Sequence, residues 1–98
     1  MDSPLISLII PTYNERQGIE SLVDSVLAQF EAAGIAAEIV VVDDNSPDGT
    51  WQLCEELSQT RPLRVLRRAG KLGLSSAVID GFGVARGSVL GVMDADGS

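Results

Sequence analysis

Histidine is absent from this 98-residue chain, and cysteine, basic residues and aromatic residues are scarce. Without histidine, carboxylates remain as the candidates for metal ligands and for acid–base groups. The single cysteine, Cys54, cannot form a disulfide within the chain, so a reducing compartment is compatible with the sequence. Seven basic residues stand against fourteen acidic ones, and the formal net charge of −7 argues against a nucleic-acid-binding surface.

Long hydrophobic runs are also missing. The first apolar stretch, residues 5–10, is preceded by Asp2 and ends at Pro11, which is unlike a signal peptide. No run approaches the roughly 20 apolar residues that a membrane span needs. Hydrophobic residues make up 45% of the chain and charged residues 21%, as is typical of a globular domain. We therefore expect one soluble, cytoplasmic domain.

Short apolar runs alternate with segments of helical periodicity along the whole chain. The runs predict strands at residues 5–10, 38–42, 63–66 and 88–93. Apolar side chains at helical spacing predict a helix between Asn14, a candidate cap, and Gly34, a candidate stop. A second helix is predicted to open at residues 48–50 and to end before Pro62. A third is predicted over 74–85, where Gly73, Ala77 and Gly81 would let the helix approach the sheet. This alternation predicts an α/β fold with a parallel sheet.

Polar clusters follow three of the predicted strands, at residues 11–15, 43–50 and 94–96. Ligands of open parallel sheets bind beyond the carboxyl ends of the strands, so the three clusters are expected to converge on one site. Carboxylates gathered on one rim repel each other unless a cation or donor groups compensate them. A nucleoside diphosphate with Mg²⁺ or Mn²⁺ supplies both, because the metal binds phosphates while base and ribose donate hydrogen bonds. Tyr13 is a candidate to pack on the base.

Asp94 and Asp96 end the last apolar run. Residues two apart on a strand point to the same side, so these carboxylates are candidates for binding one cation.

Plainer explanations stand beside these interpretations. Asn14 with Glu15 would also serve as a helix cap, and Asp43 would also hydrogen-bond the turn that residues 46–49 predict. Cys54 and Trp51 are expected to pack inside the second helix. Lys71 belongs to a basic patch with Arg64, Arg67 and Arg68, and this patch is either a solvated turn or a contact for phosphate or base.

Together these segments resemble the nucleotide-binding half of the GT-A, family 2 glycosyltransferases, and within them the polyprenyl (dolichol) phosphate mannosyltransferases. The matching segments are residues 9–15, 41–50, 71–77 and 93–96, in the same order as in the family. The resemblance implies a Rossmann-like three-layer α/β fold with strand order 3-2-1-4, helices on both faces, and the site between the first and fourth strands. The implied substrate-binding residues are Pro11, Tyr13, Glu15, Val42, Asp43, Asp44, Lys71, Asp94, Ala95 and Asp96.

The resemblance also implies a reaction. A hexose, with mannose favoured, would pass from GDP-mannose or UDP-glucose to a polyprenyl or dolichyl phosphate, with inversion at the anomeric carbon. Asp94 and Asp96 would hold Mg²⁺ or Mn²⁺ as a D-x-D motif, and Asp96 would act through the metal to stabilise the departing nucleotide. Because the acceptor phosphate is already an anion, such an enzyme needs no strong general base.

The family continues after the D-x-D motif with a leucine and a polar segment, where this chain has Gly97 and Ser98. Residues 1–98 are therefore expected to be the N-terminal nucleotide-sugar-binding part of a catalytic domain, truncated after the D-x-D motif and inactive alone. The parent enzyme is expected to lie at, or be anchored to, the cytoplasmic face of a membrane. Apolar surface left where the rest would pack predicts self-association.

Two other functions are compatible with some of the same residues. Residues 94–98 mimic the D-x-D-G-[T/S] motif of haloacid dehalogenase-type phosphatases, in which Asp94 would be the nucleophile, although that motif follows a first strand. A non-catalytic nucleotide-binding module is the other alternative. A dinucleotide-binding domain and a P-loop are disfavoured, because no G-x-G-x-x-G follows the first strand and no G-K-[S/T] is present.

Overall fold

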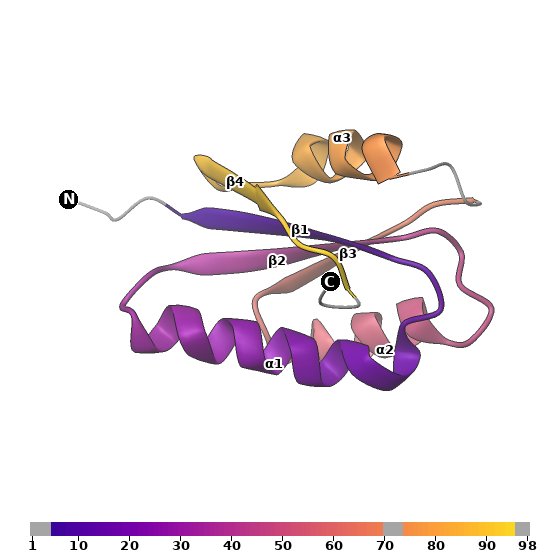
Figure 1. Ribbon diagram of the computed structural model, residues 1–98, viewed down its shortest axis with the longest axis horizontal. Helices are drawn as coiled ribbons and strands as arrows, with labels where there is room; N and C mark the ends of the chain where they lie inside the picture. Colours follow the sequence, from indigo (N-terminus) through magenta and orange to yellow (C-terminus); the bar gives the residue numbers. More distant parts are fainter. Residues whose placement is uncertain (1–4, 70–73, 96–98) are drawn as a thin grey trace.

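The computed structural model describes residues 5–69 and 74–95, which form a three-layer α/β structure (Figure 1). Parallel strands make one sheet in the order β3-β2-β1-β4, which confirms the predicted class and strand order. The strands are β1 (Ile6–Thr12), β2 (Ala37–Asp43), β3 (Leu63–Arg67) and β4 (Val89–Val92). The helices α1 (Arg16–Ala32) and α2 (Thr50–Leu57) cover one face, and α3 (Leu74–Val84) covers the other (Figure 1).

The two central strands are buried on both faces of the sheet. Side chains of β1 alternate, so that Leu8 and Ile10 join the cluster under α1 and α2 while Ile9 joins the cluster under α3. The larger cluster contains Leu8, Ile10, Ile19, Val23, Val26, Ile39, Val41, Cys54, Leu57 and Leu63. The smaller one contains Ile9, Val40, Val42 and Ala77. Burial on both faces explains why these strands read as continuous apolar runs in the sequence.

Strand β1 runs past Pro11 to Thr12, two residues further than the sequence predicts. The carbonyl of Ile9 accepts a hydrogen bond from the N–H of Met93 at 3.0 Å, so the main-chain hydrogen-bonding groups of Ile9 point toward β4. The main chain of Pro11, two residues on, points to the same side but lies beyond the last β1–β4 pair. The missing N–H of proline therefore costs no ladder hydrogen bond, and the strand continues through it.

A buried polar network at the opposite end of the sheet fixes the start of β4. The Ser7 hydroxyl donates to the Glu38 carboxylate at 2.6 Å and accepts from the Gly87 N–H at 2.8 Å. The same carboxylate accepts from the N–H of Arg86 at 2.7 Å. Both side chains are buried, so these bonds satisfy groups that water cannot reach, and they tie the turn before β4 to β1 and β2.

Helix α3 approaches the sheet closely at Gly81. A Cβ atom at this position would lie 2.6 Å from a methyl carbon of Ile9 and 3.1 Å from one of Val42. The predicted close approach is confirmed at Gly81 and at Ala77, which is buried against the sheet, while Gly73 lies outside the described residues. The predicted stop of α1 is also confirmed, because Gly34 has a φ of 70° just after the helix ends.

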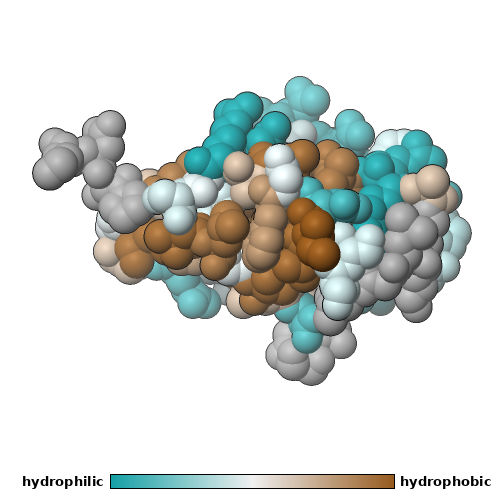
Figure 2. All heavy atoms as spheres, turned by 90° about the horizontal axis from the view of Figure 1, so that it is seen from above, coloured by the Kyte–Doolittle hydropathy of each residue, from teal (hydrophilic) through white to brown (hydrophobic). Residues whose placement is uncertain are grey.

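Apolar side chains remain exposed along one side of the molecule. Val89, Leu90 and Val92 of the edge strand β4 are 44–46% exposed, and Ile79 and Phe82 of α3 are also exposed. Figure 2, seen from the side of α3 and β4, shows apolar surface on this face. The predicted apolar surface is thus present, whereas self-association through it stays a prediction. None of the helices in the described ranges is long and apolar enough to cross a membrane.

Replacing Gly81 with alanine tests the close approach of α3. We expect Gly81→Ala to lower the free energy of unfolding by about 1–3 kcal/mol, because the methyl group overpacks against Ile9. Gly83→Ala in the same helix is the matched control, since nothing lies within 4 Å of its added Cβ. The control should gain up to about 1 kcal/mol from helix propensity. Equal urea midpoints for the two variants would contradict this packing.

Candidate functional site

The carboxyl ends of β1 and β2 form one rim of the sheet. The two strands pair in parallel up to Thr12 opposite Asp43, so the loop after β1 lies against the loop after β2. The N–H of Asp44 donates to the carbonyl of Thr12 at 3.1 Å, which extends this contact by one residue. The first two polar clusters of the sequence therefore meet, as predicted. The third follows β4, where Asp94 is exposed, but Asp96 lies outside the described residues.

Asp43 is fully buried at the centre of this rim. Its Oδ1 accepts hydrogen bonds from the Thr12 hydroxyl at 2.6 Å and the Ser46 hydroxyl at 2.7 Å. Its Oδ2 accepts from the N–H of Ser46 at 2.8 Å. A buried carboxylate requires such donors, so Asp43 cross-links the end of β1 to the loop after β2. This is the turn-forming role that the sequence left open for it.

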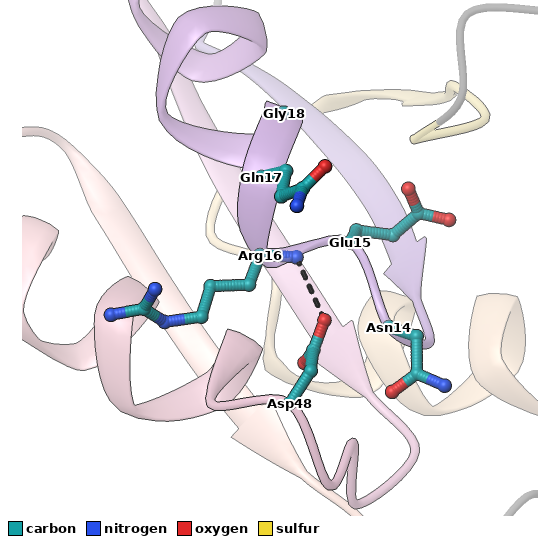
Figure 3. A pocket seen from close by; sticks show the side chains of 6 residues that line it. All are labelled: Asn14, Glu15, Arg16, Gln17, Gly18 and Asp48. Atoms are coloured by element: carbon teal, nitrogen blue, oxygen red, sulfur yellow. Dashed lines mark hydrogen bonds between the residues drawn. The ribbon is translucent and has the colours of Figure 1, made fainter.

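Side chains of the segment after β2 accept hydrogen bonds from main-chain N–H groups of the loop after β1. The N–H groups of Asn14, Glu15 and Arg16 donate to Ser46 Oγ at 2.9 Å, Thr50 Oγ1 at 3.0 Å and Asp48 Oδ2 at 3.1 Å, in that order. Figure 3 shows Asp48 reaching the main-chain nitrogen of Arg16, while the side chain of Glu15 points away from it. The carboxylates and hydroxyls of residues 46–50 therefore hold residues 14–16.

The prediction that Asn14 caps α1 is wrong. The helix begins at Arg16 with Glu15 at the N-cap position, and the Glu15 side chain makes no capping hydrogen bond. Asn14 instead has a φ of 57°, a left-handed conformation that asparagine tolerates better than most residues. The cap comes from Asp48 and Thr50, which lie 32 and 35 residues from their partners in the sequence.

The pKa of the Asp48 carboxyl is lowered by its hydrogen bonds. Burial raises it, but the bonds from the Thr50 hydroxyl and from the N–H groups of Arg16 and Thr50 outweigh that effect. The folded chain thus holds this proton less tightly than the unfolded chain does. The stabilisation that Asp48 provides is therefore complete at neutral pH and is lost as the pH falls through the lowered folded pKa.

Asp44 is held from behind by a buried arginine. Arg68, which is 6% exposed, donates from Nε to Asp44 Oδ1 at 2.5 Å. Its Nη1 donates to Ser76 Oγ at 2.8 Å and to Asp80 Oδ2 at 3.0 Å, both on α3. The hydrogen bond with Asp44 raises the pKa of Arg68 in spite of burial. One guanidinium thus links a predicted nucleotide contact to helix α3.

The other arginines of the predicted basic patch also contact protein groups. Arg64 donates to the carbonyl of Val84, and Arg67 lies 4.0 Å from the ring centroid of Trp51 while donating to Asn45 Oδ1 at 3.0 Å. The interpretation of this patch as a solvated turn is therefore wrong for the buried Arg68, whereas Arg67 is exposed. A contact of the patch with phosphate or base stays a prediction. Lys71 lies outside the described residues.

The remaining predicted site residues differ in their exposure. Tyr13 is 39% exposed, Pro11, Glu15 and Ala95 are half-buried, and Asp94 is exposed. Val42 and Asp43 are fully buried, so the structure does not offer either of them to a ligand. Within residues 5–69 and 74–95, no group of three metal-ligating side chains comes together. Asp94 is the described half of the predicted metal-binding pair.

Three comparisons agree on the relationship of this fold. The profile of the glycosyl transferase family 2 matches residues 7–98. The chain belongs to this family. Its α/β sheet with order 3-2-1-4 has the GT-A architecture, since a solved mannosyltransferase from Pyrobaculum calidifontis, in complex with GDP-Man and Mn²⁺, superposes with a TM-score of 0.83. That structure is 31% identical over 95% of this chain and 28% of its own.

Two curated family members are closer in sequence. A dolichol-phosphate mannosyltransferase from Pyrococcus furiosus is 53% identical over 91 residues, which cover 93% of this chain and 25% of the relative. A polyprenol monophosphomannose synthase from Mycolicibacterium smegmatis is 48% identical over 96 residues, which cover 93% of this chain and 35% of the relative. The chain thus spans about a quarter to a third of the length of these family members.

Two contributions to the site escaped the sequence analysis. Arg68 read as one charge of a basic run, although the acidic residues Asp44 and Asp80 that it pairs with were visible as possible partners. Ser46 and Asp48 were interpreted as parts of a turn and Thr50 as the start of a helix, although their alternate spacing places three oxygen-bearing side chains along one short segment. Neither pattern says which main-chain groups those oxygens meet.

Removing Arg68 tests its link between Asp44 and α3. We expect Arg68→Ala to lower the free energy of unfolding by about 3 kcal/mol, because it leaves the buried Asp44 carboxylate without its partner. Arg61→Ala is the matched control, since Arg61 pairs with the exposed carboxylates of Asp24 and Glu20, where water screens the interaction. Urea denaturation should give a clearly larger loss for Arg68→Ala, and equal losses would contradict the buried role.

Proposed function

We propose that residues 1–98 form the donor-nucleotide-binding part of a glycosyltransferase that moves mannose from GDP-mannose to a polyprenyl or dolichyl phosphate with inversion. The observation that carries this proposal is the rim where the loop with exposed Tyr13 and half-buried Glu15 lies against the loop that begins at buried Asp44, in a chain of glycosyl transferase family 2. The names of the two curated relatives and the GDP-Man complex of the structural neighbour support mannose as the sugar.

In this proposal the nucleoside lies across the loop after β1. Tyr13 offers an exposed ring to the base, with Pro11 at the end of β1 on one side of it in the sequence and Glu15 on the other. Arg68 occupies Oδ1 of Asp44, so Oδ2 is the oxygen that accepts a donor from base or ribose. A carboxylate already fixed by an arginine binds its ligand without a further loss of side-chain entropy.

The carboxylates after β4 are of a ligand type that suits a hard divalent cation. Asp94 is exposed at the end of β4, on the edge of the same sheet, and carboxylate oxygen is the ligand type that Mg²⁺ and Mn²⁺ prefer. Asp94 and Asp96 would hold the ion together, with Ala95 against the nucleotide and Lys71 as a contact for its phosphate or base. The ion would stabilise the charge that develops on the departing nucleoside diphosphate.

The rest of the catalytic domain belongs to the parent enzyme in this proposal. It would supply the acceptor site, and the parent would work on the cytoplasmic side of a membrane, where a polyprenyl phosphate is held. Sugar transfer by residues 1–98 alone is not expected, and turnover of GDP-mannose by this chain would contradict that division. The phosphatase alternative, with Asp94 as nucleophile, finds no support, because Asp94 follows an edge strand in a family 2 chain.

Calorimetric titration of the folded chain tests the donor site. We expect GDP-mannose and GDP to bind in the presence of Mn²⁺, and UDP-glucose to bind more weakly. The double variant Asp94→Asn/Asp96→Asn removes the charge that the metal needs while keeping the side-chain shape, so the metal dependence should disappear. Binding without any metal dependence would favour a non-catalytic nucleotide-binding module, and tighter binding of UDP-glucose would overturn the assignment of guanine.

If the folded chain binds none of these ligands, residues 1–98 do not form a working donor site. Circular dichroism before the titration excludes an unfolded sample as the cause.

A further inference from the structure

We infer that Ser46, Asp48 and Thr50 are positioning residues for the nucleotide, because they hold the loop that presents Tyr13 and Glu15. This inference rests on the proposed function. The three side chains come from alternate positions of the β2–α2 loop and accept hydrogen bonds from three consecutive N–H groups, those of residues 14–16. We call this set of bonds the loop clamp.

Two carboxylates fix the direction of the hydroxyl groups in the loop clamp. Ser46 Oγ donates its proton to Asp43, and Thr50 Oγ1 donates its proton to Asp48. Each hydroxyl therefore presents a lone pair to the loop after β1 and can only accept from it. Because Asp43 and Thr50 are fully buried and Ser46 nearly so, water cannot replace these bonds without opening the loop.

The start of α1 has no side-chain cap of its own. The helix has no acidic residue in its first turn, and its N-cap residue makes no side-chain capping bond. Asn14 is in the left-handed region, a conformation that the chain adopts only when other contacts favour it. Gly49, in the loop after β2, lies close to the side chain of Arg16, since a Cβ atom at Gly49 would be 3.0 Å from Nε of Arg16.

The loop clamp acts on the residues that flank Asn14. The N–H of Glu15 is one of the clamped groups, and Tyr13 directly precedes another, so the direction of both side chains follows from the clamped main chain. A binding loop that is already ordered spends less of its interaction energy on ordering when the ligand arrives. Loss of a clamp bond from Ser46 or Thr50 should therefore weaken nucleotide binding although both side chains are buried.

The test compares Thr50→Val with Thr50→Ser in the full 98-residue chain. Valine keeps the shape of threonine but removes the hydroxyl, so we expect the dissociation constant of GDP with Mn²⁺ to rise about tenfold, the effect of losing about one hydrogen bond. Serine keeps the hydroxyl and should bind like the unmodified chain. If the titration above selects UDP, the same comparison is made with UDP.

Ser7→Ala separates positioning from general loss of stability. It removes buried hydrogen bonds at the opposite end of the sheet from the loop clamp, and should leave the dissociation constant unchanged. A folded Thr50→Val that binds GDP as tightly as the unmodified chain overturns the inference, and so does equal weakening in Ser7→Ala. If Thr50→Val does not fold, Asp48→Asn decides in its place, because Asp48 is exposed and the change puts an amide donor among the N–H groups that it accepts from.

Failure of this inference and failure of the proposed function give different results. Where the unmodified chain binds GDP and Thr50→Val binds it equally well, the donor site stands and the positioning role falls. Where the folded, unmodified chain binds neither GDP nor UDP, the donor site falls and the positioning role falls with it.

Discussion

The buried carboxylate of Asp43 is the interaction on which the site depends. Its charge lies at the end of β2 with no access to water, and hydroxyl and N–H donors of Thr12 and Ser46 surround it. A charge in this position is tolerated only while those donors stay in place, so separating the ends of β1 and β2 costs free energy.

Burial, with the charge of Asp43 in addition, raises the pKa of the Cys54 thiol to about 12. This cysteine is therefore a packing residue of α2, as its sequence context indicates.

Each loop at this rim is held by the other loop rather than by its own helix. The N-terminus of α1 is capped from the loop after β2, and that loop is anchored on the end of β1 through Asp43. Arg68 adds a third connection, because it binds Asp44 on one side and α3 on the other. These hydrogen bonds therefore join the loops after β1 and β2 and helix α3 into one connected unit, which carries Tyr13 and Glu15. Parallel pairing makes this possible, since it brings the carboxyl ends of neighbouring strands to the same edge.

The sequence was sufficient for the features that depend on local pattern. Alternating apolar runs and helical periodicities located every element, and the motif order implied the 3-2-1-4 sheet that the structure has. The errors concern partners that are distant along the chain. Asn14 has the residue type of a cap, but the capping oxygens belong to a loop more than thirty residues away. Arg68 has the context of a charged surface run, but its partner Asp44 lies 24 residues before it. No local pattern reports such distances.

The sequence was sufficient to predict which segments form the site, but not which of its neighbouring residues are fully buried. Asp43 and Asp44 are adjacent in the sequence, yet one carboxylate points into the protein and the other lies against Arg68 near the surface. Neighbouring residues at the end of a strand point to opposite sides, and which side is buried depends on the helices packed there. A motif therefore names both residues, whereas only the packing says which one is fully enclosed and which one keeps a small exposed fraction.

The most direct test of the donor site is a nuclear magnetic resonance titration of the ¹⁵N-labelled chain with GDP and Mg²⁺. We expect amide shift changes at residues 13–15, at Asp44 and around Asp94, with the far end of the sheet near Ser7 and Glu38 unchanged. Changes confined to the exposed face of β4 and α3, or an unchanged spectrum of the folded chain at saturating GDP, would contradict it.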